Sequence, residues 1–116
     1  MPLLNITTNV SKSKVPEGLP IIFSQEFAKL MGKPIDYVAC NISTDNIMAF
    51  GGSSEPCALV TLTFLGQASA QKHATYSKRM SELLHEHLGI SKNRYYLHFV
   101  AASAENIGYQ GHTFAS

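Results

Sequence analysis

The sequence has few charged residues and no concentration of charge of one sign. Nine basic and eight acidic residues make up 15% of the 116-residue chain, compared with about 25% in typical soluble domains. This shortage predicts that part of the surface is hidden in an oligomer. A net charge of +1 and the lack of Lys or Arg runs predict that neither nucleic acid nor a membrane is a partner.

Long apolar runs and cysteine pairs are also missing. The longest apolar run, residues 57–65, contains two threonines and is shorter than the roughly 18 residues of a membrane-spanning helix. The amino-terminal residues do not form a conventional secretory signal, so synthesis in the cytosol is expected. The two cysteines, Cys40 and Cys57, are predicted to be reduced thiols. No Cys/His spacing predicts a metal site, and no glycine-rich phosphate loop is present, so no cofactor is expected.

The first half of the chain predicts a strand, a helix and a second strand. Residues 2–8 have the composition of a short strand. Apolar residues at three- and four-residue spacing predict a helix with Pro16 in its first turn and Gly32 at its end; they are Leu19, Phe23, Phe27 and Leu30. Residues 37–43 alternate with the period of a strand.

The second half repeats this order after a turn-rich connection over residues 44–56. Residues 57–65 are predicted to be a strand, and residues 94–101 another. Between them, a helical face ends at Gly89; it carries Tyr76, Met80, Leu83, Leu84 and Leu88. The length of the chain favours one domain over residues 1–116.

Two similar halves predict an α+β fold made of duplicated βαβ units. Right-handed crossovers would give a four-stranded sheet with both helices on one face. The other face would be bare and apolar in a monomer, so self-association is expected. Residues 104–116 are predicted to form a turn and an edge strand that pairs with a neighbouring copy.

Pro2 is the first candidate for chemistry. Trimming of the initiator Met would leave proline as the amino terminus, with a free secondary amine. Such an amine acts as a base at neutral pH only if apolar burial or a nearby positive charge lowers its pKa. Lys33 would supply the charge, and the apolar walls could come from Leu3, Tyr37, Tyr96 and Phe114. The alternative is that Pro2 merely starts an edge strand.

Two further candidates have structural alternatives of their own. Lys33 follows a helix-ending glycine, where its charge interacts favourably with the helix C-terminus. Tyr96 and His98 share one face of a predicted strand, which places a hydroxyl and an imidazole side by side. Neither arrangement alone specifies an activity.

A longer set of residues carries a family resemblance over essentially the whole chain. The matching segments are residues 1–2, 8–10, 32–34, 48–59, 76–78 and 94–96. Together they resemble the macrophage migration inhibitory factor family of the tautomerase superfamily. The resemblance implies a homotrimer of βαβ-repeat subunits around a central channel, with keto-enol tautomerase sites between subunits.

The resemblance also implies roles for individual residues. Pro2 would be the general base, acting on phenylpyruvate, hydroxyphenylpyruvate and D-dopachrome. Lys33 and the backbone N–H of Leu65 would bind the substrate carboxylate, and Lys33 would hold down the amine pKa. Tyr96 would come from the neighbouring subunit, and an apolar rim would accept the substrate ring; its members are Tyr37, Ile107, Tyr109 and Phe114.

Four positions depart from the vertebrate pattern, one of which is Leu65 in place of Ile. His98 replaces an Asn among the substrate-binding residues, which predicts altered substrate preference or pH dependence. Tyr109 stands in place of Trp. Val60 stands in place of the second cysteine of a CxxC motif, so the thiol-disulfide activity proposed for that motif is doubtful here.

A cytokine-like role is the alternative that the resemblance raises. Lys12 and Asp45 match a basic-acidic pair implicated in receptor engagement, although two solvated surface charges explain them equally well. Family members leave cells without a signal peptide, which would allow export from the cytosol and a cell-surface receptor as partner. The chain could then be a receptor ligand whose tautomerase pocket is vestigial.

Overall fold

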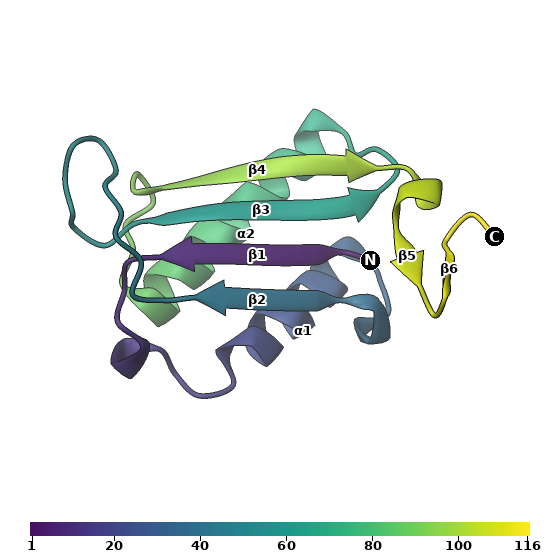
Figure 1. The fold of residues 1–116 in the computed structure, drawn as a ribbon. Coiled ribbons are helices and arrows are strands. Elements are labelled where there is room, and N and C mark those ends of the chain that lie inside the picture. Colours follow the sequence, from purple (N-terminus) through teal and green to yellow (C-terminus); the bar gives the residue numbers. More distant parts are fainter.

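The computed structural model describes the whole chain, Met1 to Ser116, as one sheet covered by two helices on one face (Figure 1). The sheet has the strand order β2-β1-β3-β4, with β1 Leu3–Thr8, β2 Ala39–Ser43, β3 Ala58–Leu65 and β4 Tyr95–Ala102. The helices are α1 Leu19–Met31 and α2 Ala70–Leu88. Shorter elements are η1 Lys12–Lys14, η2 Ile35–Tyr37, η3 Ala104–Asn106, β5 Gly108–Tyr109 and β6 His112–Thr113.

The strand pairing confirms the prediction of two βαβ units. β1 is parallel to β2, with Leu3 opposite Ala39, and β3 is parallel to β4, with Ala58 opposite Tyr95. The two units join through an antiparallel pairing of β1 with β3, in which Leu3 is opposite Thr63. The sheet is therefore mixed, and the amino ends of β1 and β2 lie at the same end as the carboxyl ends of β3 and β4.

The helix ends agree better with the sequence prediction than the helix starts. Gly32 and Gly89 stop α1 and α2 in the left-handed conformation, with φ of 65° and 66°, as expected for glycine at this position. The predicted start of α1 at Pro16 is wrong. Gly18 has φ of 77°, which is incompatible with a right-handed helix. Helix α1 therefore begins at Leu19, directly after Gly18.

The core lies between the helices and one face of the sheet. Alternate strand residues enter a cluster of 16 buried side chains, as the two-residue period of a strand requires. β1 contributes Leu4 and Ile6, β3 contributes Val60 and Leu62, and the helices contribute Phe23, Phe27, Met80 and Leu84 among others. The two cysteines are free thiols, and burial raises the pKa of Cys40 to about 11, which disfavours thiolate chemistry at that residue.

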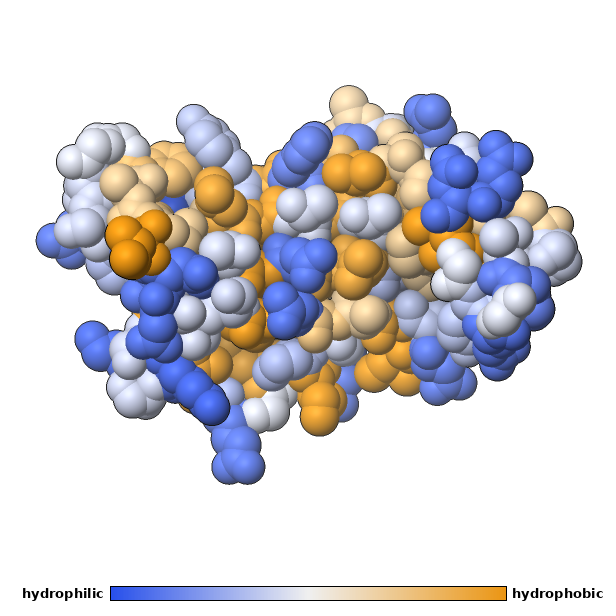
Figure 2. All heavy atoms as spheres, in the orientation of Figure 1, coloured by the Kyte–Doolittle hydropathy of each residue, from blue (hydrophilic) through white to orange (hydrophobic).

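The face of the sheet away from the helices is open, and it is more polar than predicted. One row of side chains crosses all four strands in register; it consists of Asn41, Asn5, Thr61 and His98. Apolar side chains such as Leu59, which is 51% exposed, alternate with the polar ones, and Figure 2 shows this mixed surface. None of the four strands contains Lys, Arg, Asp or Glu.

Neither helix is both long enough and apolar enough to cross a membrane.

Candidate active site

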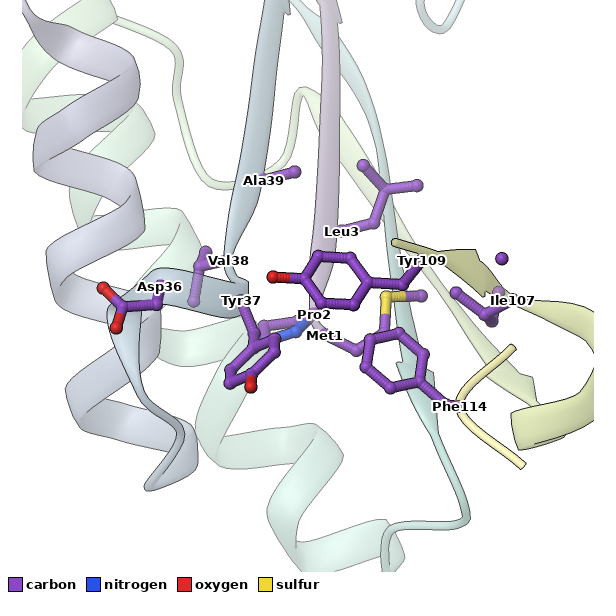
Figure 3. A pocket seen from close by; sticks show the side chains of 11 residues that line it. Met1, Pro2, Leu3, Asp36, Tyr37, Val38, Ala39, Ile107, Tyr109 and Phe114 are labelled. Atoms are coloured by element: carbon purple, nitrogen blue, oxygen red, sulfur yellow. The ribbon is translucent and has the colours of Figure 1, made fainter. Parts of the chain in front are cut away.

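A cavity of about 280 Å³ lies where the amino ends of β1 and β2 meet the carboxyl-terminal segment (Figure 3). The backbone N–H of Ala39 donates to the carbonyl of Pro2 at 3.0 Å, which fixes Pro2 beside the start of β2. The chain after β4 folds back over this end, and the N–H of Phe114 donates to the carbonyl of Ile107 at 3.2 Å. Segments from both ends of the sequence therefore enclose the cavity.

Three aromatic rings form one wall of the cavity. The rings of Tyr109 and Phe114 stack with centroids 5.2 Å apart, and Tyr37 lies 5.6 Å from Tyr109 and 6.1 Å from Phe114. Eight of the 11 lining residues are hydrophobic. A site with this apolar aromatic lining suits a flat aromatic ligand.

An amino group with an altered pKa lies at the same place. Pro2 is buried, and Met1 lines the cavity beside it. The pKa of the Met1 amino group is lowered from its usual value of 8.0, first because burial disfavours the charged form and second because Lys33 is positively charged. Both causes favour a free amine that can accept a proton at neutral pH.

Tyr96 and His98 do not reach this cavity within one chain. Tyr96 is opposite Leu59 on β3, and Leu59 is opposite Thr7 on β1. Tyr96 is therefore displaced along the strands by four residues from the level of Leu3, or about 13 Å at 3.3 Å per residue. Its side chain, 69% exposed, belongs to the open face and to the other end of the sheet.

Comparison with known proteins decides the family. The family described as "Macrophage migration inhibitory factor (MIF)" matches residues 1–115. The factor of Meriones unguiculatus is 42% identical over 115 residues, covering 99% of this chain and all of that protein. This chain belongs to the macrophage migration inhibitory factor family.

Solved structures agree with this assignment. The factor of Trichinella spiralis has a TM-score of 0.92 and 34% identity, over 97% of this chain and 99% of that one. The homologue of Prochlorococcus marinus has a TM-score of 0.88 and 28% identity, over 97% and 98% of the two chains. The fold is that of the tautomerase superfamily, and membership in it supports an isomerase-type activity.

Two residues that the family resemblance assigned to carboxylate binding lie near the cavity without lining it. Lys33 follows Gly32 at the end of α1, and its backbone N–H donates to the carbonyl of Ala28 at 2.9 Å. Its side chain is exposed and makes no ion pair with a carboxylate. Leu65 ends β3 at the same end of the sheet, where it lines a separate cavity with Gly66 and Ala102.

The structure adds Asp36 to the residues that line the aromatic cavity. The sequence did not indicate Asp36 because this residue belongs to η2, a short 3-10 segment over Ile35–Tyr37. The predicted strand over residues 37–43 overlapped this segment at Tyr37, whereas β2 begins only at Ala39. The only signal was Pro34, which starts this turn.

Lys12 and Asp45, the pair that matches a receptor-binding pattern of the MIF family, lie in contact. The backbone N–H of Lys12 donates to the Asp45 carboxylate at 3.0 Å, and the Thr44 hydroxyl donates to the same oxygen at 2.8 Å. The Thr44 hydroxyl, followed by the Lys12 N–H, lowers the pKa of the carboxyl group. This contact holds two loops together through the backbone rather than through the Lys12 ammonium.

No three His, Cys, Asp or Glu side chains converge in a way that would hold a metal ion.

Proposed function

We propose that this chain, folded as a single domain over residues 1–116, is a keto-enol tautomerase of aromatic 2-keto acids. Phenylpyruvate and hydroxyphenylpyruvate are the proposed substrates, with D-dopachrome as a non-natural one. Removal of Met1 makes Pro2 the amino terminus and the general base. The observation that supports this most strongly is a buried Pro2 that lines an aromatic cavity, at a place where burial and Lys33 lower the pKa of the adjoining Met1 amino group.

The reaction moves one proton within the substrate. The Pro2 nitrogen takes a proton from C3 of the keto acid, and the C–H electron pair forms the C2–C3 double bond while the C2 carbonyl becomes an enolate. The protonated amine then gives its proton to the enolate oxygen, which yields the enol and restores the free amine. The reverse sequence converts enol to ketone, so no oxidant, metal or cofactor is consumed.

Lowering of the amine pKa is what makes this proton transfer efficient near neutral pH. An ordinary secondary amine is almost fully protonated at pH 7 and cannot accept another proton. Burial of Pro2 and the positive charge of Lys33 act in the same direction, because both destabilise the protonated amine. A general base with a pKa close to the working pH combines a free lone pair with sufficient basicity.

In the proposed site, apolar side chains bind the aromatic ring of the substrate and polar groups bind its carboxylate. The rings of Tyr37, Tyr109 and Phe114, together with Ile107, accept the aromatic end of the substrate. Lys33 and the backbone N–H of Leu65 bind the carboxylate, which places C3 toward Pro2. Because the Lys33 side chain has no protein carboxylate partner, its charge is available for an anionic substrate.

The active protein is proposed to be a homotrimer in which each site is completed by a neighbour. The open sheet face has no charged strand residues, so packing against other copies buries no unpaired charge. Tyr96 lies at the other end of the sheet from Pro2, and His98 lies two strands away from β1, so neither residue lines the cavity beside Pro2 of its own chain. A neighbouring copy supplies both side chains to the substrate.

The alternative is a receptor-binding ligand, made in the cytosol and exported without a signal peptide, with a vestigial pocket. Membership in the MIF family supports this class of function in general. The contact between Lys12 and Asp45 does not strengthen it, because the Asp45 carboxylate already binds backbone and hydroxyl donors within the chain. The two functions are compatible, so the tautomerase assay tests the enzyme proposal alone.

The enzyme proposal is tested by enol-keto conversion of phenylpyruvate, followed by ultraviolet absorbance at neutral pH. Protein with Pro2 at its amino terminus, verified by mass spectrometry, is compared with protein carrying a short amino-terminal extension. Turnover by the first form and its loss in the second supports the amine as base. Equal turnover by both forms, or none by either, refutes it.

A further inference from the structure

The most extensive set of side chain to backbone contacts in the chain belongs to Arg94, a residue that the proposed mechanism does not use. Its guanidinium donates to the carbonyls of Phe50 at 2.6 Å, Glu55 at 2.7 Å and Ser53 at 3.1 Å, and Nε donates to Pro56 at 3.3 Å. It makes no ion pair with a carboxylate. Arg94 therefore fastens the connection between β2 and β3 to the start of β4.

Phe50 is held in this connection by its own turn as well. Phe50 and Ser53 exchange two backbone hydrogen bonds, at 2.9 and 3.1 Å, around Gly51 and Gly52. Both glycines have positive φ, of 60° and 79°, as a tight two-residue turn of this kind requires. The backbone of Phe50 is thus fixed locally by the turn and globally by Arg94.

The side chain of Phe50 contacts both Arg94 and Tyr96. The guanidinium carbon of Arg94 lies 5.6 Å from the Phe50 ring centroid, within the range of cation–π attraction. The rings of Phe50 and Tyr96 have centroids 4.8 Å apart and are inclined by 49°. Arg94 immediately precedes β4 and Tyr96 is the second residue of that strand, so the Phe50 ring contacts both at the start of β4.

The geometry points to Arg94 and Phe50 as positioning residues for the substrate-binding Tyr96. This inference rests on the proposed function, in which Tyr96 contacts the substrate of a neighbouring copy. Within its own chain, Phe50 is the single aromatic ring in contact with Tyr96, whose side chain is otherwise largely exposed to solvent or to a neighbouring copy. Without that contact Tyr96 samples several rotamers, and substrate binding must order it again.

Substitutions of Phe50 and Arg94 are expected to raise KM while leaving kcat nearly unchanged. Phe50→Leu removes the ring, and Arg94→Lys keeps the charge but cannot reproduce the fork of guanidinium donors. Each is expected to raise KM for phenylpyruvate about three- to tenfold, the cost of ordering one side chain. The kcat value stays within about twofold because the proton transfer at Pro2 is untouched.

Matched variants separate positioning from general damage. Phe50→Tyr keeps an aromatic ring and should therefore keep the wild-type KM. Glu55→Gln changes a side chain of the loop but keeps the backbone carbonyl that Arg94 binds, so its KM should also stay at the wild-type value. In a Tyr96→Ala background, Phe50→Leu should have no further effect on KM, because the side chain it positions is absent. Equal KM for wild type and Phe50→Leu, or a fall in kcat that matches the rise in KM, overturns the inference.

A second measurement keeps this inference separate from the proposed function. In protein with labelled tyrosines, the Tyr96 ring signals in NMR spectra should shift in Arg94→Lys as well as in Phe50→Leu. Unchanged Tyr96 signals in Arg94→Lys overturn the role of Arg94, whether or not the protein is active. If wild type and variants all lack turnover while these signals shift, the proposed function fails and the positioning of Tyr96 by Arg94 stands.

Discussion

The two ends of the sheet are built in different ways. At the Pro2 end, residues of one chain surround an aromatic cavity, and strand pairing and the returning carboxyl-terminal segment fix its walls. At the Tyr96 end, a largely exposed tyrosine has one aromatic neighbour and does not line the aromatic cavity. The proposed base and the aromatic wall therefore lie at one end of the sheet, and the hydroxyl proposed to bind substrate lies at the other.

This contrast implies that the proposed site, with Pro2 and Tyr96 acting on one substrate, needs two copies of the chain. Side chains that serve one substrate must converge within a few ångströms, and the register of the sheet prevents this within one molecule. Assembly around the open face removes the conflict, because the far end of one sheet can meet the near end of another. Local folding makes half of the proposed site, and association makes the other half.

The largest expected effect comes from changing the base itself. Pro2→Gly leaves an amino terminus but replaces the secondary amine with a primary one that lacks the ring. Turnover of phenylpyruvate should fall about 100-fold or more, the usual contribution of a general base. Size-exclusion chromatography and circular dichroism should show unchanged assembly and fold; full turnover in this variant contradicts the role of Pro2.

Mixing two defective chains tests whether the ends of different copies meet. Pro2→Gly and Tyr96→Ala chains, each weak alone, are produced together so that trimers contain both. Random mixing in a closed ring should pair an intact Pro2 with an intact neighbouring Tyr96 at about a quarter of the sites. Activity no higher than the mean of the two parents means that one chain completes the site.

Removal of the nearby charge is expected to have a smaller effect. Lys33 lowers the pKa of the Met1 amino group, and we expect the same charge to lower that of the Pro2 amine once Met1 is removed. Lys33→Ala should therefore raise the pKa of the Pro2 amine and move the acidic limb of the kcat/KM profile to higher pH. Loss of the carboxylate contact should also reduce kcat/KM about tenfold at neutral pH. Lys29→Ala, on the last turn of the same helix, is the control, and equal effects of the two substitutions would count against the site.

The smallest expected effect concerns substrate choice at His98, which lies midway along the open face of the sheet. His98→Asn restores an amide that can donate and accept hydrogen bonds at the same time. The ratio of kcat/KM for hydroxyphenylpyruvate and phenylpyruvate should change about two- to fivefold, the value of one modest hydrogen bond. An unchanged ratio would mean that His98 does not contact the substrate ring.

Local signals in the sequence predicted much of the fold. Glycine at positions 32 and 89 marked both helix ends, and the alternation of apolar residues separated the buried strand face from the open one. The start of α1 was missed because it depends on the positive φ of Gly18, a backbone property that composition does not reveal. The polar row on the open face was missed because its members come from four strands whose register was unknown.

The candidate site was less predictable for the same reason. Pro2 and Lys33 were recognised by their chemistry, and the roles of Leu65 and the aromatic rim came only from the family resemblance. The contacts of Arg94 join residues 38 to 44 positions apart, and no periodicity encodes such pairs. Long-range contacts of one side chain with backbone carbonyls become visible only when the loop conformation is known.

The most direct test of the account is a titration of the Pro2 nitrogen in protein processed to this residue and labelled with ¹⁵N-proline. The account predicts that the amine titrates well below the range of an ordinary secondary amine, at the same pH as the acidic limb of kcat/KM for phenylpyruvate. Titration of Pro2 in the ordinary range, or an acidic limb that does not follow it, would contradict the claim that Pro2 is the catalytic base.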